Sequence, residues 1–145
     1  MSYFFLFPGQ GSQKPGMGQD FYAESPAAQD VFDRAAAIAG DGFLDTVFGG
    51  EQEQLNDTNI AQIALLAAGA AIIAHLATEG ITPTGAAGHS LGEITALVAT
   101  GALEFEDAMR ITRERARLMS EDVPEGTMAA VIGFAPEKIE SLLPE

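Results

Sequence analysis

The fold is decided by residues 84–100, which read TGAAGHSLGEITALVAT. The first four residues are small and suit a short strand, and Leu91–Thr100 is apolar at helical spacing. Between them stands Gly88-His89-Ser90-Leu91-Gly92, a Gly-x-Ser-x-Gly pattern. Between a strand and a helix, this pattern is typical of a nucleophile elbow, a sharp turn that lifts a serine oxygen out of the end of a sheet. The sequence therefore predicts that Ser90 is the nucleophile of an acyl-transfer site.

The residue types around Ser90 have a physical reason. Gly88 and Gly92 leave out side chains that would collide across so tight a turn. The helix that begins at Leu91 offers free N–H groups and a positive dipole end, so the Leu91 N–H is a candidate donor to a developing oxyanion. The alternative is a glycine-rich strand–helix turn in which Ser90 only caps the helix. The local residues leave both interpretations open.

A serine nucleophile needs a general base, and the chain has two histidines. His89 is adjacent to Ser90, so we expect its side chain to point elsewhere. His75 lies one turn from the end of a long apolar helix, where a surface or C-terminal-turn histidine is the expected interpretation. No general base is therefore expected within these 145 residues, and we expect the chain alone to transfer acyl groups poorly or not at all.

The first half of the chain predicts one strand and a long central helix. Tyr3–Phe7 has no polar face, which is typical of a strand covered on both sides in a parallel sheet. A tight polar loop, Gly9–Gln13, follows it. Residues 60–76 are rich in Ala, Ile and Leu, which favours a buried central helix over a membrane span. The expected ends of this helix are Asp57-Thr58 and Gly80.

The order of the other elements predicts the fold class. Helices are expected over Pro26–Ala39 and Phe105–Met119, a strand over Met128–Phe134, and a last helix that Pro136 opens. Strands alternating with helices imply an α/β fold, a parallel sheet with helices on its faces. The run Val123–Gly126 predicts a boundary. A lone strand and helix after it cannot bury their apolar faces, so we expect an incomplete structural unit.

Composition excludes several classes of function. Apolar residues make up 47% of the chain, as in a globular protein, and there is no cysteine for a disulfide, a thiolate metal site or a cysteine nucleophile. No targeting segment is predicted. A net charge of −14 argues against nucleic acid as a partner. An acidic chain is also poorly suited to docking an acidic protein.

Four of the five arginines fall between residues 110 and 117. One helix face carries Arg110, Arg113 and Arg117. Arg115 is predicted to lie on the apolar face instead, between Ile111 and Met119 and close to Ala108 and Leu118. A buried guanidinium keeps its charge and needs an anion. That anion is either a protein carboxylate, of which the chain offers 21, or the carboxylate of a substrate, and the residues favour neither.

Several runs together resemble the malonyl-CoA:acyl carrier protein transacylases of fatty-acid synthesis and the acyltransferase domains of polyketide synthases. The runs are Phe7–Gln13 (FPGQGSQ), Gly88–Glu93 (GHSLGE), Arg115–Met119 (RARLM), Val123–Gly126 (VPEG) and Met128–Ala130 (MAA). Their order and spacing agree with the family from Tyr3 to the end of the chain. Ile94 and Ile63 stand where many relatives have an aromatic residue and a proline.

The resemblance implies a role for each candidate site residue. Ser90 would carry the acyl group as an ester, and the backbone N–H groups of Gln10 and Leu91 would form the oxyanion hole. Arg115 would hold the free carboxylate of malonyl. The remaining substrate-binding candidates are Gln62, where the family has a pocket-lining glutamine, and His89. The substrate is then malonyl-CoA, the reaction is a ping-pong transfer, and neither a metal nor a redox cofactor is expected.

The resemblance also implies a domain organisation and partners. Residues 1–124 resemble the N-terminal part of the hydrolase-like acyltransferase subdomain, and residues 125–145 the start of a small ferredoxin-like subdomain. The family's catalytic histidine lies in a later segment, so a further segment or a second chain is expected to supply the base. The acceptor is acyl carrier protein, and the expected compartment is the cytoplasm. This acidic partner would dock on the arginine face or, as we expect, mainly on the missing part.

Three other functions stay open at this point. The chain is alternatively a non-catalytic truncated fragment that only binds, since its motifs are intact but its base is missing. It is alternatively a polyketide-type acyltransferase, because the residues do not separate malonyl from substituted malonyl groups. A serine esterase of the α/β-hydrolase type would explain the elbow, but not the loop of Gln10 or Arg115.

Overall fold

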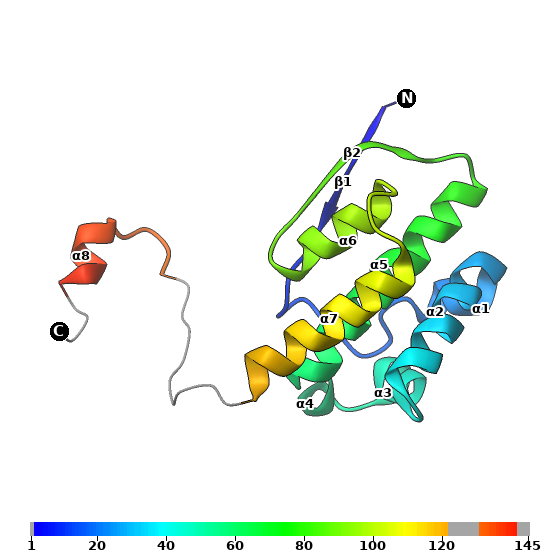
Figure 1. Cartoon of the computed structure of the whole chain (residues 1–145), viewed down its shortest axis with the longest axis horizontal. Helices are drawn as coiled ribbons and strands as arrows, with labels where there is room; N and C mark the ends of the chain where they lie inside the picture. The colour runs from blue at the N-terminus through cyan, green and yellow to red at the C-terminus, as the bar shows by residue number, and fades with distance from the viewer. Residues whose placement is uncertain (1, 122–130, 142–145) are drawn as a thin grey trace.

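The computed structural model describes residues 2–121 and 131–141, in which helices pack beside a small parallel sheet at the edge of the molecule (Figure 1). The elements are β1 (Tyr3–Phe7), α1 (Gln19–Glu24), α2 (Pro26–Ala39), α3 (Phe43–Gly49), α4 (Gln52–Leu55), α5 (Thr58–Thr78), β2 (Pro83–Gly88), α6 (Leu91–Ala99), α7 (Phe105–Ser120) and α8 (Pro136–Glu140). This α/β order confirms the predicted fold class.

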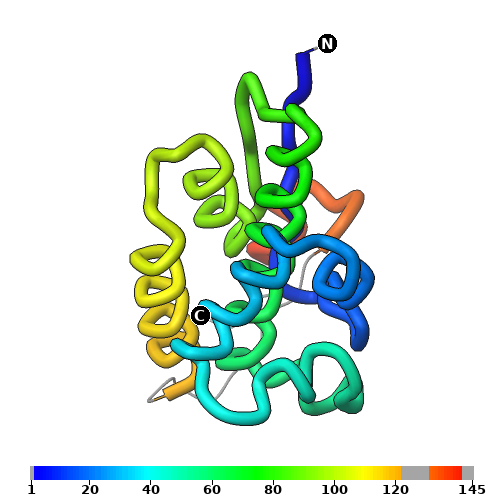
Figure 2. The backbone as a smooth tube through the Cα atoms, turned by 90° about the vertical axis from the view of Figure 1, so that its right-hand side faces the viewer, coloured from blue at the N-terminus to red at the C-terminus, as the bar shows by residue number. Residues whose placement is uncertain are grey.

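Helix α5 is the centre of the molecule. The side chain of Asp57 accepts the N–H of Asn59 at 2.8 Å at its start, and Gly80 takes a φ of 71° just past its end. Nine of its residues are buried, and it packs between α2 and α7 (Figures 1 and 2). Its length and composition would suffice to cross a membrane, but half of its most apolar window is buried inside the fold. The predicted central helix is confirmed.

The main core lies around α5. Buried side chains of α2, α3 and α7 meet it there because each of these helices turns one apolar face inward. The largest of the fully buried side chains are Phe32, Leu55, Leu66, Leu91 and Met109. This packing makes α5 and α7 a rigid frame, and both helices contribute residues to the site described below.

Strands β1 and β2 pair in parallel, with a register that runs from Tyr3 opposite Pro83 to Phe7 opposite Gly88. Helix α6 packs against both strands. However, Phe4 is 62% and Leu6 is 76% exposed. The prediction of a strand covered on both sides is therefore wrong within the described residues, because no element there covers these two side chains.

The other predicted elements were found, with one exception, the strand over residues 128–134. The helix over Pro26–Ala39 has the expected bounds, and α6, α7 and β2 differ from the expected bounds by about one residue. The short helices α1, α3 and α4 were not predicted. The predicted strand Met128–Phe134 is wrong over residues 131–134, which are exposed and pair with no described strand; residues 128–130 lie outside the described residues.

The predicted boundary at residues 123–126 also lies outside the described residues. Beyond it, Pro136 opens α8 as predicted, and α8 buries no residue. The division into residues 1–124 and 125–145 therefore stays a prediction.

Candidate acyl-transfer site

Ser90 occupies a strained turn between β2 and α6. Its φ is 56°, and it is the only non-glycine residue with a positive φ in the described part of the chain. A Cβ placed on Gly88 would lie 1.9 Å from the carbonyl carbon of Gly92, and a Cβ on Gly92 would lie 2.3 Å from the carbonyl oxygen of Phe7. The sequence prediction that glycines are required on both sides of this serine is confirmed. Glu93 steadies the turn, since its Oε1 accepts the Ser90 N–H at 3.1 Å.

The loop after β1 lies against this turn. The N–H of His89 donates to the carbonyl oxygen of Phe7 at 3.1 Å. The His89 ring lies so close to Gly9 that a Cβ there would be 2.7 Å from Nδ1. Gln13 is buried and holds the loop from inside: its Oε1 accepts the Gly11 N–H at 2.8 Å. The backbone of Gln10 is therefore carried on a loop that packs directly beside the serine turn.

Gln62 connects this loop to Arg115. The Gln62 side chain is fully buried on α5, and its Nε2 lies 3.4 Å from Oε1 of Gln10 and 3.5 Å from Sδ of Met119. Its Oε1 accepts a hydrogen bond from Nη1 of Arg115. The other terminal nitrogen, Nη2 of Arg115, donates to Ser90 Oγ at 2.8 Å. The structure thus brings four predicted site residues into one hydrogen-bonded chain: Gln10, Gln62, Arg115 and Ser90.

The reason given from the sequence for an inward-facing Arg115 is wrong. Three of its four expected neighbours on the apolar face are exposed, Ile111 by 48%, Leu118 by 59% and Met119 by 38%, and Ala108 is the one that is buried. The buried face of α7 consists of Phe105, Ala108, Met109, Thr112 and Ala116. This buried face packs against α5, and Ile111 lies outside it. Arg115 is half-buried at the border of the face. Its guanidinium reaches the serine turn from this border.

The guanidinium of Arg115 has no carboxylate partner among the described residues. Both oxygens that it contacts, Gln62 Oε1 and Ser90 Oγ, are neutral. Of the two anions considered from the sequence, the protein carboxylate is thus not found in this part of the chain. Within residues 2–121 and 131–141, a positive charge without a counterion lies next to the serine oxygen, an arrangement suited to a carboxylate ligand.

Two backbone N–H groups at the site make no hydrogen bond within the described residues. They belong to Gln10, on the loop after β1, and to Leu91, the first residue of α6. The first N–H groups of a helix have no partner in the helix itself and attract negative charge. Both groups are therefore free to donate to an anionic oxygen formed at Ser90.

Neither histidine contacts the serine oxygen. The His75 ring packs edge-on against Phe21, with ring centroids 5.2 Å apart. His89 is exposed, with its ring over Gly9. Among the described residues, the side-chain partner of Ser90 Oγ is Arg115 and not an imidazole. The substrate-binding role considered for His89 stays a prediction.

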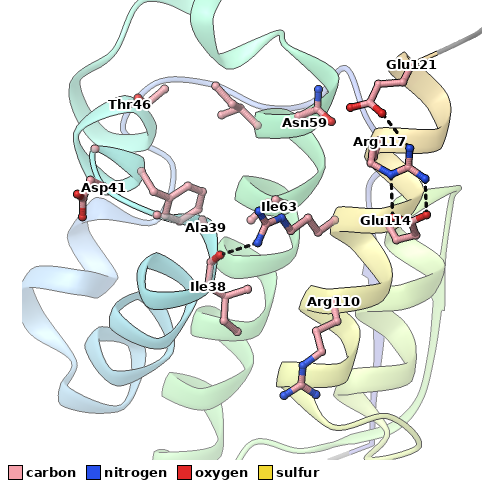
Figure 3. A pocket seen from close by; sticks show the side chains of 15 residues that line it. Ile38, Ala39, Asp41, Thr46, Asn59, Ile63, Arg110, Glu114, Arg117 and Glu121 are labelled. Carbon is pink, nitrogen blue, oxygen red and sulfur yellow. Dashed lines mark hydrogen bonds and ion pairs between the residues drawn. The ribbon is translucent and has the colours of Figure 1, made fainter.

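The three arginines on the other face of α7 line a separate cavity of about 590 Å³ (Figure 3). Arg117 pairs with Glu114 at 2.7 Å and with Glu121 at 2.8 Å, and Arg110 pairs with Asp107. The hydrogen bond from Arg117 lowers the pKa of Glu114. Arg113 donates to the carbonyl oxygen of Ile38 at 3.3 Å. Much of the positive charge on this face is thus neutralised within the chain.

The sequence interpretation missed four residues that support the site: Gln13, Thr58, Glu93 and Met119. Gln13, Glu93 and Met119 belong to runs that carry the family resemblance, but their side-chain contacts depend on the folded arrangement. Thr58 accepts a hydrogen bond from Nε2 of Gln10 at 3.1 Å, across 48 residues of sequence. No local pattern signals such a pair.

A serine at a strained strand–helix turn at the end of a parallel sheet, with an arginine against its oxygen, places the chain in the class of α/β acyl-transfer proteins. Within that class the match is specific. Residues 4–142 match the acyl transferase domain family, and the chain belongs to this family.

Curated relatives of the family are similar over nearly the whole chain. The malonyl CoA-acyl carrier protein transacylase of Bacillus subtilis (strain 168) is 46% identical over 140 residues, which cover 95% of this chain and 44% of the relative. The protein of the same name from Staphylococcus aureus (strain MRSA252) is 40% identical over 139 residues, 94% of this chain and 44% of the relative. The chain thus spans less than half the length of these relatives and corresponds to their N-terminal part.

Solved structures give the same result. The acyl-carrier-protein-S-malonyltransferase of Bartonella henselae is 36% identical, with a TM-score of 0.89, and the match covers 98% of this chain and 47% of that one. The malonyl CoA-acyl carrier protein transacylase of Clostridium perfringens has a TM-score of 0.82 and 31% identity, over 98% and 46% of the two chains. A complex named PlMCAT:AntF, a type II PKS acyl-carrier protein with its malonyl-transacylase, has a TM-score of 0.80 at 41% identity, over 88% and 41%.

Proposed function

We propose that the chain carries the serine half of a malonyl transfer, from malonyl-CoA to the thiol of acyl carrier protein, in fatty-acid biosynthesis in the cytoplasm. The observation that carries this proposal is the contact of 2.8 Å between Nη2 of Arg115 and Oγ of Ser90. A nucleophile beside a cation that pairs with no carboxylate in the described part of the chain suits an acyl group that itself ends in a carboxylate. The names of the curated relatives support the same substrate.

In the first half-reaction, Ser90 Oγ attacks the thioester carbonyl of malonyl-CoA. Its proton passes to a general base that a further segment or a second chain supplies. The carbonyl oxygen becomes an anion, which the N–H groups of Gln10 and Leu91 stabilise. The C–S bond then breaks, the malonyl ester of Ser90 remains, and the CoA sulfur leaves with the proton.

The second half-reaction reverses these steps with another thiol. The carrier-protein sulfur attacks the ester carbonyl and gives its proton to the base. The C–O bond to Ser90 breaks, and the serine oxygen takes the proton back. Throughout, Arg115 would hold the free carboxylate of the malonyl group and thereby fix the pose of the ester. Neither step requires a metal or a redox cofactor.

The acyl carrier protein would dock away from the arginine face of α7. Acidic residues of the chain already pair with Arg110 and Arg117 on that face, so it offers little free charge to an acidic partner. We propose that the docking surface and the general base lie in the part of the relatives that these 145 residues do not cover. In that arrangement residues 1–124 belong to the hydrolase-like subdomain and residues 125–145 begin the ferredoxin-like one.

The test is to incubate the chain with malonyl-CoA and to follow the mass of peptides that contain Ser90. The chain alone is expected to gain little or no malonyl, and addition of the separately made C-terminal part of the Bacillus subtilis relative is expected to raise the yield. Ser90→Ala is the control that should remove the adduct. Normal turnover by the chain alone would contradict the missing base, and malonyl on another residue would contradict the role of Ser90.

Two alternatives have specific support. Arg115, and not a histidine, contacts Ser90, which also fits a fragment that binds but does not catalyse. The acyltransferase domain from the second module of the salinomycin polyketide synthase is 38% identical with a TM-score of 0.77, over 86% of this chain and 30% of that one, which keeps a polyketide-type enzyme open. Methylmalonyl-CoA in the same mass assay separates the substrates. Hydrolysis of simple esters in the absence of a thiol would instead support an esterase.

A further inference from the structure

Arg115 differs from the other arginines in its partners. Arg34 pairs with Asp30 and Glu106, Arg110 with Asp107, and Arg117 with Glu114 and Glu121. Arg113 is exposed and donates to a main-chain carbonyl. Arg115 is half-buried, yet both of its acceptors are neutral side-chain oxygens. One of these acceptors is Gln62, whose side chain is fully buried. The chain has 21 acidic residues, yet a neutral glutamine holds this position.

We propose that Gln62 is a positioning residue that holds the Arg115 guanidinium toward Ser90 and leaves its positive charge unpaired. The proposal rests on the proposed function, since that charge serves a substrate carboxylate there. The buried amide is fixed by two contacts besides Arg115, with Gln10 and with Met119. It therefore offers Arg115 a rigid acceptor.

The direction of the hydrogen bonds supports this role. An arginine only donates, so Gln62 must turn its oxygen to Arg115 and its NH₂ group to Gln10. Gln10 then accepts through its own oxygen, and its Nε2 donates to Thr58 Oγ1 at 3.1 Å. One orientation of each amide satisfies the whole chain. The orientation of Arg115 is thus tied to the loop whose backbone N–H is proposed to bind the oxyanion.

A neutral acceptor has a different electrostatic effect from a carboxylate. A glutamate at position 62 would orient Arg115 equally well, but its negative charge would cancel the positive charge that a substrate carboxylate requires. An apolar residue would preserve the charge but leave the guanidinium free to move, and binding would then have to order it. Of these three kinds of side chain, glutamine is the one that combines an ordered guanidinium with an unpaired charge.

Two substitutions in the chain of 145 residues separate orientation from charge. The first readout is the affinity for malonyl-CoA divided by that for acetyl-CoA, which lacks the carboxylate, measured by calorimetry. The second is the order of the Arg115 Nε–H group, measured by ¹⁵N NMR relaxation. Gln62→Leu should lower the affinity ratio by about fivefold and loosen Arg115. Gln62→Glu should lower the ratio by about thirtyfold while Arg115 stays ordered.

Controls define the scale. Arg115→Ala sets the ratio without a guanidinium, and Gln29→Glu adds the same charge at an exposed position of α2. Thermal melting by circular dichroism shows whether each variant folds. Gln62→Glu keeps the shape of the side chain. If Gln62→Leu does not fold, the affinity ratio of Gln62→Glu therefore tests the proposal.

The outcomes separate the two proposals. If the wild-type chain prefers malonyl-CoA, a Gln62→Glu chain that keeps this preference would overturn the proposal. A Gln62→Leu chain in which Arg115 stays as ordered as in the wild type would overturn the positioning role in any case. If the wild-type chain does not distinguish the two thioesters, but Arg115 loosens in Gln62→Leu, the positioning of Arg115 stands and the proposed substrate fails.

Discussion

At the scale of single residues, Ser90 shows how the site is held in a conformation that serine does not favour. Its φ of 56° is sterically unfavourable for a residue with a side chain. The turn exists because Gly88 and Gly92 let three backbone segments approach closely, among them the end of β1 at Phe7. Glu93 adds a hydrogen bond to the Ser90 N–H. The position of the serine oxygen is thus a product of backbone packing, and it depends on the absence of side chains at Gly88 and Gly92.

Replacing Gly88 by alanine tests this dependence. Its Cβ would lie 1.9 Å from a backbone carbon of Gly92, which cannot move without displacing α6. We expect Gly88→Ala to lower the free energy of unfolding by about 3 kcal/mol, at the upper end of the cost of overpacking. Urea titration followed by circular dichroism measures it. The matched control is Gly49→Ala, at the end of α3, where a Cβ would meet nothing within 4 Å; an equal loss in both variants would contradict the explanation.

At the scale of elements, α7 serves the core and the site with different faces. Its buried residues pack on α5, while Arg115 at the border of that face reaches Ser90. The N-terminal turn of α7 is tied to α2 by a pair between Glu106 and Arg34. The hydrogen bond from Arg34 lowers the pKa of Glu106. This pair helps to set the position of α7, and so of Arg115.

The lowered pKa of Glu106 predicts a pH dependence of stability. A carboxyl whose pKa is lower in the folded than in the unfolded chain stabilises the fold above its unfolded pKa, and that stabilisation is lost as the pH falls through the folded pKa. The pair is more than a third exposed, so solvent screens it, and Glu106→Gln should cost only about 0.5 kcal/mol at neutral pH.

Thermal melting of the wild-type and Glu106→Gln chains over a pH series measures this difference in stability. The difference should disappear at a pH below the folded pKa of Glu106. Glu24→Gln, which removes a carboxylate that forms no ion pair among the described residues, is the control. A destabilisation by Glu106→Gln that persists unchanged in acid would show that the ion pair is not its cause.

At the scale of the whole molecule, the helical part is well packed but the sheet is not. Phe4 and Leu6 of β1 are largely exposed. Next to them, a groove of about 440 Å³ runs between β1 and α5, lined by Leu65, Ile72, Ile73 and Leu76 among others. An exposed apolar strand of this kind promotes association. The chain that carries the site thus has an apolar surface unlike that of a typical soluble monomer.

We expect the chain to bind the apolar dye ANS and to associate with increasing concentration. Leu6→Lys should reduce both effects because it places a charge on the exposed strand. It should change the free energy of unfolding by less than about 0.5 kcal/mol, since Leu6 is 76% exposed. Dye fluorescence and sedimentation velocity measure the result. Gln29→Lys places a lysine on α2 as a control, and an equal reduction by this variant would indicate an effect of net charge and not of the strand.

Much of the fold could be predicted because its signals are local. The caps at Asp57 and Gly80, the apolar run of α5 and the glycines around Ser90 each act on neighbouring residues. The short helices α1, α3 and α4 were missed because four to seven residues carry too little periodicity to be recognised. The strand expected over residues 128–134 failed over its described part because strands depend on distant partners.

The sequence by itself determined the serine turn, the central helix and the family, because these depend on steric and apolar patterns along the chain. Only the tertiary structure decided what surrounds Ser90. From the sequence, Arg115 was assigned to a buried apolar face, but it contacts the serine oxygen directly from the border of that face, while its other terminal nitrogen donates to a buried glutamine. Gln10, Gln62, Ser90 and Arg115 come from four separate segments. Hydrogen bonds between them depend on how α5, α6 and α7 pack together, and no local pattern of residues records that packing.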